Sequence, residues 1–329
     1  MQNFRTTFKI SSLPFSISHQ DKILSIGSCF AENIGGKLEE NKFQILLNPF
    51  GILYNPSSVA QSLERIFKNE KIGEKDILQH NDLWHSRLHH TRFSQTDKAT
   101  FLENINANLN AANVFLKQTN RLLITLGTAF VWEEKETGNI VANCHKRSQK
   151  LFTRRRLSIS EIKENLLAIL RKIKTQNSDL QVIMTLSPVR HTNDGFVENQ
   201  RSKAALILAI DELCQEENFI HYFPAYELVQ DDLRDYRFYA KDMLHPNEVA
   251  VDYIWEHFQD VLFTPQTKEI FREIKKLKVM ASHRPFQVES VAHQNFLQNN
   301  LRRIEDLEKH YDFLNFAEER QIFESQLLA

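Results

Sequence analysis

Five short runs of apolar and β-branched residues alternate along the chain with longer segments of mixed polarity. Runs this short and this continuously apolar are typical of strands that are buried on both faces of a parallel sheet. We therefore predict four or five strands in one central parallel sheet. They cover residues 22–27, 43–48, 121–127, 180–189 and 219–224.

The segments between these runs repeat their apolar positions every three or four residues, which predicts amphipathic helices. Residues 55–58 (NPSS) and 158–161 (SISE) have the residue types of helix starts, and the second fits a capping box. Strands that alternate with helices favour an α/β fold with helices on both faces of the sheet. The predicted helices cover residues 56–69, 98–118, 157–176 and 199–217.

The composition changes near residue 264, where strand candidates end and charged helical patterns begin. We divide the chain into an N-terminal arm (1–21), an α/β domain (22–263) and a helical C-terminal extension (264–329). The extension is expected to pack on the sheet domain or to support a homo-oligomer. Its mixed charges are interpreted as a solvated face.

Overall composition narrows the classes of function. Hydrophobic residues make up 42% and charged residues 25%, and the formal net charge is −1. This balance gives no electrostatic basis for nucleic acid or an anionic membrane as a partner. No segment has the roughly 18 apolar residues of a membrane span, and residues 1–20 lack a signal-peptide core. With only three cysteines, we expect a cytoplasmic protein with free thiols.

Ligand sites of parallel sheets gather at the carboxyl ends of the strands. The first predicted strand ends there in GSCF, with Ser28 and Cys29 at the start of a helix. Unpaired backbone N–H groups and the helix dipole favour a thiolate and an oxyanion at such a position. The alternative is that Ser28 caps the helix and Cys29 is a small buried residue.

A second candidate is Asp242-x-x-His245, which precedes another amphipathic helix. An aspartate three residues before a histidine can fold back in a turn and hold one imidazole nitrogen. The other nitrogen is then left for a nucleophile. The alternative is that Asp242 only stabilises a turn and His245 lies on the surface.

These blocks together resemble the SGNH (GDSL-type) hydrolases, and more narrowly the GSCFA family. The family blocks occur in order over residues 22–258, from SIGSCFAENIG through NPFGILYNP, TLGTAFVWE, NCHK and SPVRH to LRDYRFYAKDMLHP. The resemblance implies a three-layer α/β/α, flavodoxin-like fold. It also implies a hydrolase-type site that acts on an ester, thioester or other acyl bond of a small or acylated substrate.

Placing GSCFAE on the GDSLTE pattern without gaps puts Cys29 at the nucleophile and Ser28 beside it, whereas a slip by one residue reverses them. The resemblance assigns oxyanion donors to the N–H of Cys29 and to Gly51. The asparagine of the third SGNH block is replaced by Ala129. Thr128, or a residue of a predicted hairpin that returns at Asn143 and His145, is expected to replace it.

Further candidates line the same expected edge. Arg190 and His191 follow a strand, and an arginine there suits a carboxylate or phosphate of the substrate. The alternative is an ion pair of Arg190 with Asp194 or Glu198. His89 lies in WHSRLHH (84–90), which we interpret as pocket-lining or core histidines rather than a metal site, because the glutamate of H-E-x-x-H is absent.

The sequence contains no glycine-rich phosphate loop and no C-x-x-C pair, so we expect no cofactor. The basic cluster 146–156 is interpreted as a solvated face or the lip of an anionic-substrate site. The sequence therefore favours an acyl-ester hydrolase with Cys29 (or Ser28), His245 and Asp242. An O-acyltransferase and a non-catalytic module that binds an anionic ligand are the alternatives.

Overall fold

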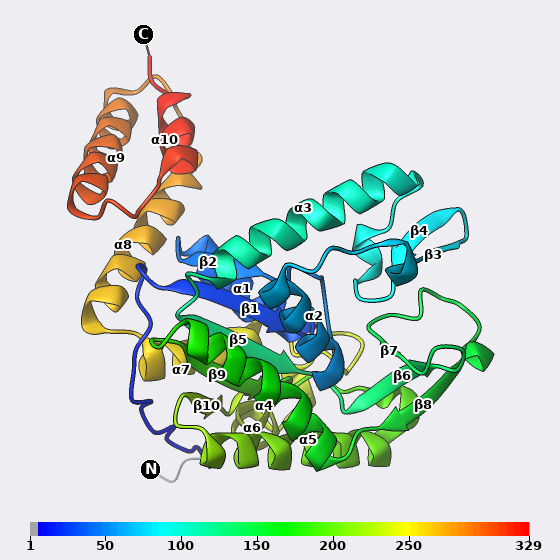
Figure 1. Ribbon diagram of the computed structural model, residues 1–329. Helices are drawn as coiled ribbons and strands as arrows, with labels where there is room; N and C mark the ends of the chain where they lie inside the picture. Colours follow the sequence, from blue (N-terminus) through cyan, green and yellow to red (C-terminus); the bar gives the residue numbers. More distant parts are fainter. Residues whose placement is uncertain (1–5, 329) are drawn as a thin grey trace.

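The computed structural model describes residues 6–328. Its centre is a five-stranded, fully parallel sheet with the order β2-β1-β5-β9-β10 (Figure 1). This is the flavodoxin-like order of a doubly wound sheet, in which the order of strand addition reverses between the first and third strands along the chain. The strands are β1 (Lys22–Gly27), β2 (Gln44–Leu47), β5 (Arg121–Leu126), β9 (Gln181–Leu186) and β10 (Ile220–Phe223).

Helices cover both faces of the sheet, so the domain has three layers, as predicted. One face packs against α2, α3, α4 and α5, and the other packs against α1 and α7. The four predicted helices are confirmed as α2 (Pro56–Lys68), α3 (Lys98–Leu116), α4 (Ile159–Gln176) and α5 (Phe196–Glu216). The second layer contains α1 (Cys29–Glu40), α7 (Glu248–Leu262) and the short α6 (Ala225–Glu227).

Both predicted helix-start signals act as expected. The side chain of Asn55 accepts a hydrogen bond from the N–H of Ser58 at the start of α2. Ser158 and Glu161 form a reciprocal capping box at the start of α4. Each pairing satisfies backbone donors that a helix end would otherwise leave without a partner.

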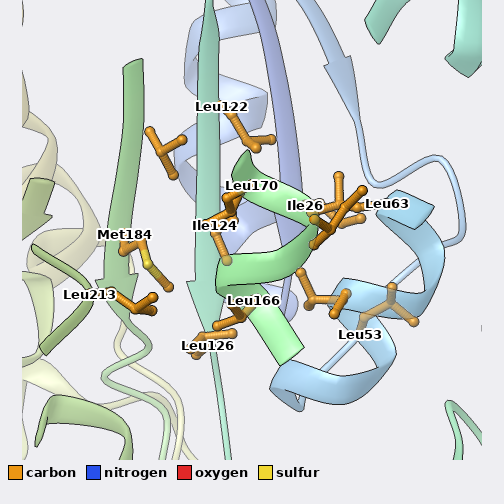
Figure 2. Packing of buried hydrophobic residues seen from close by; sticks show 14 of the residues in the cluster. Ile26, Leu53, Leu63, Leu122, Ile124, Leu126, Leu166, Leu170, Met184 and Leu213 are labelled. Carbon is orange, nitrogen blue, oxygen red and sulfur yellow. The ribbon is translucent and has the colours of Figure 1, made fainter. Parts of the chain in front are cut away.

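The core explains why the strands are apolar on both faces. Leu122, Ile124 and Leu126 of β5 point to one face, where they pack with Leu166 and Leu170 of α4 (Figure 2). The intervening Leu123 of β5 belongs to the cluster on the opposite face. Because successive side chains of a strand alternate between faces, a strand covered on both sides must be apolar throughout.

Two small antiparallel sheets complete the domain. The hairpin predicted at ETGN joins β6 (Phe130–Glu134) to β7 (Ile140–Val141), with Gly138 at φ 70° in the turn. The other side of β6 pairs with β8 (Phe152–Arg156), so part of the basic cluster is a strand. A separate hairpin pairs β3 (Ile77–His80) with β4 (Leu83–Ser86). The β6–β8 sheet follows β5 directly and borders the carboxyl end of the central sheet.

The C-terminal extension consists of three helices with their own apolar cluster. Figure 1 shows α9 and α10 standing away from the α/β domain. Glu319 of α10 nevertheless forms an ion pair with Lys42, and Lys42 also lies over the ring of Phe316. The helices are α8 (Pro265–Ala281), α9 (Val291–His310) and α10 (Ala317–Glu324).

The predicted N-terminal arm is described from residue 6 onward, and its first five residues lie outside the described part. The N–H of Ile17 donates to the carbonyl of Leu262 at the end of α7. The arm is thereby attached to the second helical layer. Within residues 6–328, no helix combines the length and the apolar composition needed to cross a membrane.

Candidate functional site

A pocket of about 390 Å³ lies at the carboxyl edge of the sheet, next to the point where the strand order reverses. Cys29 after β1 and Thr128 after β5 line it, together with Arg190, His191 and His245 from later loops. Crevices at such a reversal are the usual ligand sites of open α/β sheets. The fold therefore brings residues from four separate sequence blocks to one pocket.

The turn from β1 into α1 depends on Gly27. This residue has φ 146°, and a Cβ atom there would lie 2.1 Å from the carbonyl oxygen of Thr125 on β5. The N–H of Ser28 donates to that same oxygen at 2.9 Å. Only a residue without a side chain lets the chain pass β5 this closely before the helix starts.

Ser28 and Cys29 occupy different environments. Ser28 has an exposed fraction of 0%, and its hydroxyl forms no hydrogen bond with residues 6–328. Cys29 is partly exposed and lines the pocket. The geometry therefore presents the thiol, rather than the hydroxyl, to a ligand.

Opposing effects act on the thiol of Cys29. Burial is the largest, and it raises the thiol pKa above its ordinary value. Hydrogen bonding from the backbone N–H groups of Phe30 and Cys29 and the charge of Lys203 lower this pKa, whereas the charge of Glu32 raises it. Because the thiol is mostly protonated at neutral pH, a neighbouring base has to remove its proton before it can attack.

The candidate base, His245, lies on the loop before α7. The carboxylate of Asp242 accepts hydrogen bonds from the N–H groups of Leu244 and His245, at 2.9 and 3.0 Å. Its second oxygen lies 2.6 Å from Nδ1 of the His245 ring. The N–H donors of His245 and Leu244 and then the imidazole lower the pKa of Asp242 to about 2. The ionised carboxylate fixes Nδ1–H as a donor, which leaves Nε2 as the acceptor.

The loop that carries His245 is attached to the loop that carries Arg190. The N–H of Arg190 donates to the carbonyl of Leu244 at 3.2 Å. His245 and Cys29 line the same pocket, although no hydrogen bond joins them within the described residues. Contacts between a nucleophile and its base are often long before substrate binds.

The expected oxyanion donors are only partly brought together. Gly51 does not line the pocket, and its N–H is already used to close a turn by donating to the carbonyl of Asn48 at 2.7 Å. Thr128 lines the pocket, but its N–H donates to Tyr54 and its hydroxyl bonds with Ser202. Asn143 also lines the pocket; its side-chain oxygen accepts from the N–H of His145, and its amide nitrogen has no hydrogen bond within the described residues. Of the expected donors, those that no other residue of the described chain occupies are the N–H of Cys29 and the amide of Asn143.

Two histidines expected at the substrate lie in the interior instead. His145 is 3% exposed, and its ring bonds with the hydroxyl of Thr91 and the carbonyl of Ser86. His89 is 1% exposed and stacks on Phe50 at 4.1 Å between ring centres. Burial lowers their pKa values to about 4 and about 3. Both are neutral core histidines, which for His89 is one of the two interpretations given for WHSRLHH, whereas His145 was expected at the substrate.

Arg190 does not form either of the alternative ion pairs. Asp194 pairs with Arg154, and Glu198 pairs with Arg156 and Arg201. No carboxylate within residues 6–328 pairs with Arg190. Its guanidinium lies over the rings of Tyr236 and Tyr239, at 5.0 and 4.4 Å from their centres, and it lines the pocket. A guanidinium held by aromatic rings and left without a counter-charge suits an anionic ligand.

His191 occupies the floor of the pocket beside Gly127. A Cβ atom on Gly127 would lie 2.8 Å from Nε2 of His191 and 3.3 Å from Cβ of Ser28. This Nε2 is buried without a hydrogen bond in the described chain. Burial and then the charge of Lys203 lower the pKa of His191 to about 3. The ring is therefore neutral near pH 7 and differs in role from the exposed His245.

Sequence reasoning missed one wall of the pocket. Phe130 and Trp132 of β6 line it together with Tyr54 and Arg154. Arg154 lies over the ring of Trp132 at 4.6 Å while it pairs with Asp194. The spacing of two between the aromatic residues places both on one face of the strand, which is the signal that could have found them.

A second missed group lies on α5. Asn199, Ser202 and Lys203 lie in the predicted helix 199–217, and all three are at most 4% exposed. Each holds a pocket loop: Asn199 accepts from the N–H of His191, and Ser202 accepts from the N–H of Ala129. They share one helical face with the buried Leu206 and Leu213. In the sequence, these polar residues continue the apolar stripe of the helix, and this pattern could have predicted that they are buried.

Comparisons with known proteins place the chain in a family. No curated protein matches it. Among solved structures it is similar to an acetyl xylan esterase from the rumen bacterium Butyrivibrio proteoclasticus, at 13% identity and a TM-score of 0.34. That alignment covers 78% of this chain and 64% of the other, so the chain spans less than two thirds of its length. Residues 274–329 match the C-terminal domain of GSCFA domain proteins. Residues 22–258 match the GSCFA family, and the chain therefore belongs to the GSCFA family.

Proposed function

We propose that this protein hydrolyses an acyl ester through a covalent intermediate on Cys29. One observation carries the proposal: a partly exposed thiol at the N-terminus of α1 shares a pocket with His245, whose Nδ1 lies 2.6 Å from the carboxylate of Asp242. A nucleophile, a base and a group that orients the base are the parts of an acyl-transfer site. The order of the sequence blocks, which resembles that of SGNH hydrolases, points to the same chemistry.

In the first half of the reaction, Nε2 of His245 takes the proton of the Cys29 thiol. The thiolate attacks the ester carbonyl carbon, and a C–S bond forms as the carbonyl electron pair moves to oxygen. The N–H of Cys29 and the amide of Asn143 are the donors available to this oxyanion. The C–O bond then breaks, and the imidazolium of His245 gives its proton to the departing alkoxide. Asp242 stabilises the imidazolium throughout.

In the second half, His245 takes a proton from water as the water oxygen attacks the thioester carbon. The C–S bond breaks, and the thiolate of Cys29 recovers the proton from His245. The products are a carboxylic acid and the free enzyme. An alcohol in place of water would make the same site an acyltransferase, since the proton transfers are identical.

The choice of Cys29 over Ser28 is supported by burial. The hydroxyl of Ser28 is buried, whereas the thiol of Cys29 reaches the pocket. Attack by Ser28 would require its hydroxyl to turn out of the interior first. The helix N-terminus also favours the residue at its first position, because the free N–H groups lie there.

The test compares Cys29 with the two other cysteines of the chain, Cys144 and Cys214, which serve as internal controls. Cys144 also lines the pocket but lies away from a helix N-terminus, and Cys214 lies on α5. We expect intact-protein mass spectrometry with p-nitrophenyl acetate to show one acetyl group on Cys29. Cys29→Ala should abolish this adduct and turnover, whereas Cys144→Ser and Cys214→Ser should keep both. His245→Asn should lower kcat/KM by roughly 10²–10⁴-fold.

Other outcomes would decide against this mechanism. An acetyl group on Ser28, lost in Ser28→Ala, would transfer the role of nucleophile to the serine. Unchanged turnover in Cys29→Ala would remove the thiol from the mechanism. No adduct and no turnover with neutral or anionic esters, together with tight binding of a small anion, would favour the non-catalytic binding module.

A further inference from the structure

Lys203 is a buried cation beneath the pocket. It lies on α5 with an exposed fraction of 2%. Its Nζ donates to the carbonyl oxygens of Gly127 at 2.8 Å and Ser187 at 2.6 Å. These carbonyls follow the last residues of β5 and β9, so the ammonium joins two neighbouring strand ends. No carboxylate in residues 6–328 forms an ion pair with it.

A buried ammonium without a counter-ion is costly, because removal from water disfavours the charged form. Burial lowers the pKa of Lys203 to about 7, and the charge of Cys29 acts in the opposite direction. Attaching a pocket loop to α5 does not by itself require a charge, since the neighbouring Ser202 holds the loop after β5 with a hydroxyl. The hydroxyl of Ser202 accepts from the N–H of Ala129 at 2.7 Å.

The position of Lys203 explains where its charge acts. Gly127, whose carbonyl it binds, packs against Ser28, the residue before the proposed nucleophile. The ammonium is thus linked through a single residue, Gly127, to the start of α1, where the positive end of the helix dipole also lies. Among the groups around Cys29, it lowers the thiol pKa, whereas burial and Glu32 raise that pKa.

We infer that Lys203 is a positioning residue for the proposed reaction: its buried ammonium stabilises the thiolate of Cys29 while its hydrogen bonds hold the Gly127 and Ser187 carbonyls beneath the pocket. The inference rests on the function proposed above and adds a source of positive charge to it. When the thiol loses its proton, the negative charge on sulfur is balanced by the ammonium of Lys203 as well as by the imidazolium of His245.

Other ionisable groups face the same thiol, and a test has to hold them constant. Glu32 comes from α1, and Arg92 pairs with it at 2.6 Å. Tyr54 precedes α2 and lines the pocket, as does His245 from the loop before α7. Substitutions at Lys203 leave all of these side chains in place.

The first experiment measures the rate of iodoacetamide alkylation of Cys29 against pH, in the full chain with Cys144→Ser and Cys214→Ser. In Lys203→Met we expect alkylation at pH 6 to be about tenfold slower or more, because Lys203, with a pKa of about 7, still carries its charge there in the unsubstituted protein. Ser202→Ala is the matched control, because it removes an uncharged contact to the same loop. Its alkylation rate at pH 6 should stay within about twofold of the unsubstituted rate. An unchanged rate at pH 6 in folded Lys203→Met would overturn the inference.

A second measurement needs no substitution at Lys203. Cys29 is alkylated either with iodoacetate, which leaves a negative charge, or with iodoacetamide, which leaves a neutral adduct of similar size. The lysine ε-carbon signal is then followed by NMR against pH. We expect a higher pKa for Lys203 in the charged adduct, and equal midpoints would contradict the inference even if Lys203→Met fails to fold. Absence of ester turnover in the unaltered protein would count against the proposed function but leave both thiol measurements interpretable.

Discussion

The close approach of the Gly27 backbone to β5 is tested by the substitution Gly27→Ala, which adds one methyl group. In Gly27→Ala, the new Cβ would lie 2.1 Å from the carbonyl oxygen of Thr125, and real Cβ atoms essentially never come within 3.0 Å of such a neighbour. The neighbour is main chain in the centre of the sheet, so it cannot turn away as a side chain would. The backbone of β1 or β5 would have to move by about 1 Å.

The cost has two parts. A side chain at φ 146° occupies a region that only glycine adopts readily, which costs about 1–3 kcal/mol. Displacement also weakens the hydrogen bonds from Gly27 N–H to the Asn48 side chain and from Ser28 N–H to Thr125, at about 1 kcal/mol each. The free energy of unfolding should therefore fall by about 3–5 kcal/mol, and Tm by roughly 6–10 °C.

Gly36, on the same chain segment, provides the matched control. It lies inside α1, and nothing is within 4 Å of a Cβ placed on it. Gly36→Ala should raise the free energy of unfolding by about 0.5–1 kcal/mol, because alanine loses less conformational entropy in a helix. Differential scanning calorimetry and urea unfolding of both variants supply the comparison. A Tm of Gly27→Ala within 1 °C of the unsubstituted protein would refute this reasoning, as would an equal loss in Gly36→Ala.

Two further predictions concern charge. The buried rings of His19, His89, His145 and His191 have pKa values lowered to about 4, 3, 4 and 3, so the unfolded chain takes up protons below pH 6.5 that the folded chain does not. Stability should therefore fall from pH 6.5 toward pH 4, by on the order of 2 kcal/mol at pH 5 for His89 alone. His89→Asn should flatten the dependence of Tm on pH over this range, and parallel curves would contradict the assignment. Arg190→Gln should raise KM for a succinyl ester by about tenfold or more relative to an acetyl ester. Equal changes for the two esters would remove Arg190 from anion recognition.

The sequence by itself determined the architecture and the local parts of the site. Five apolar runs became the five parallel strands because a strand covered on both faces needs apolar side chains on both. The pairing of Asp242 with His245 was also predictable, since it joins residues three apart within one turn. Helix starts at Asn55 and Ser158 followed from contacts equally close in sequence.

Only the tertiary structure decided which side chains share the pocket. Gly51 was expected there, but its N–H is used in a turn, and His145 was expected at the substrate, but its ring bonds inside the domain. Arg154 belongs to the predicted basic cluster and lines the pocket, and Lys203 belongs to a predicted helix and lies beneath the pocket. Whether a polar side chain meets solvent, a ligand or a distant carbonyl depends on contacts between segments far apart in the chain. Periodicity and spacing report only on neighbours within a turn or a strand, so these partners appear only once the sheet has brought its strand ends together.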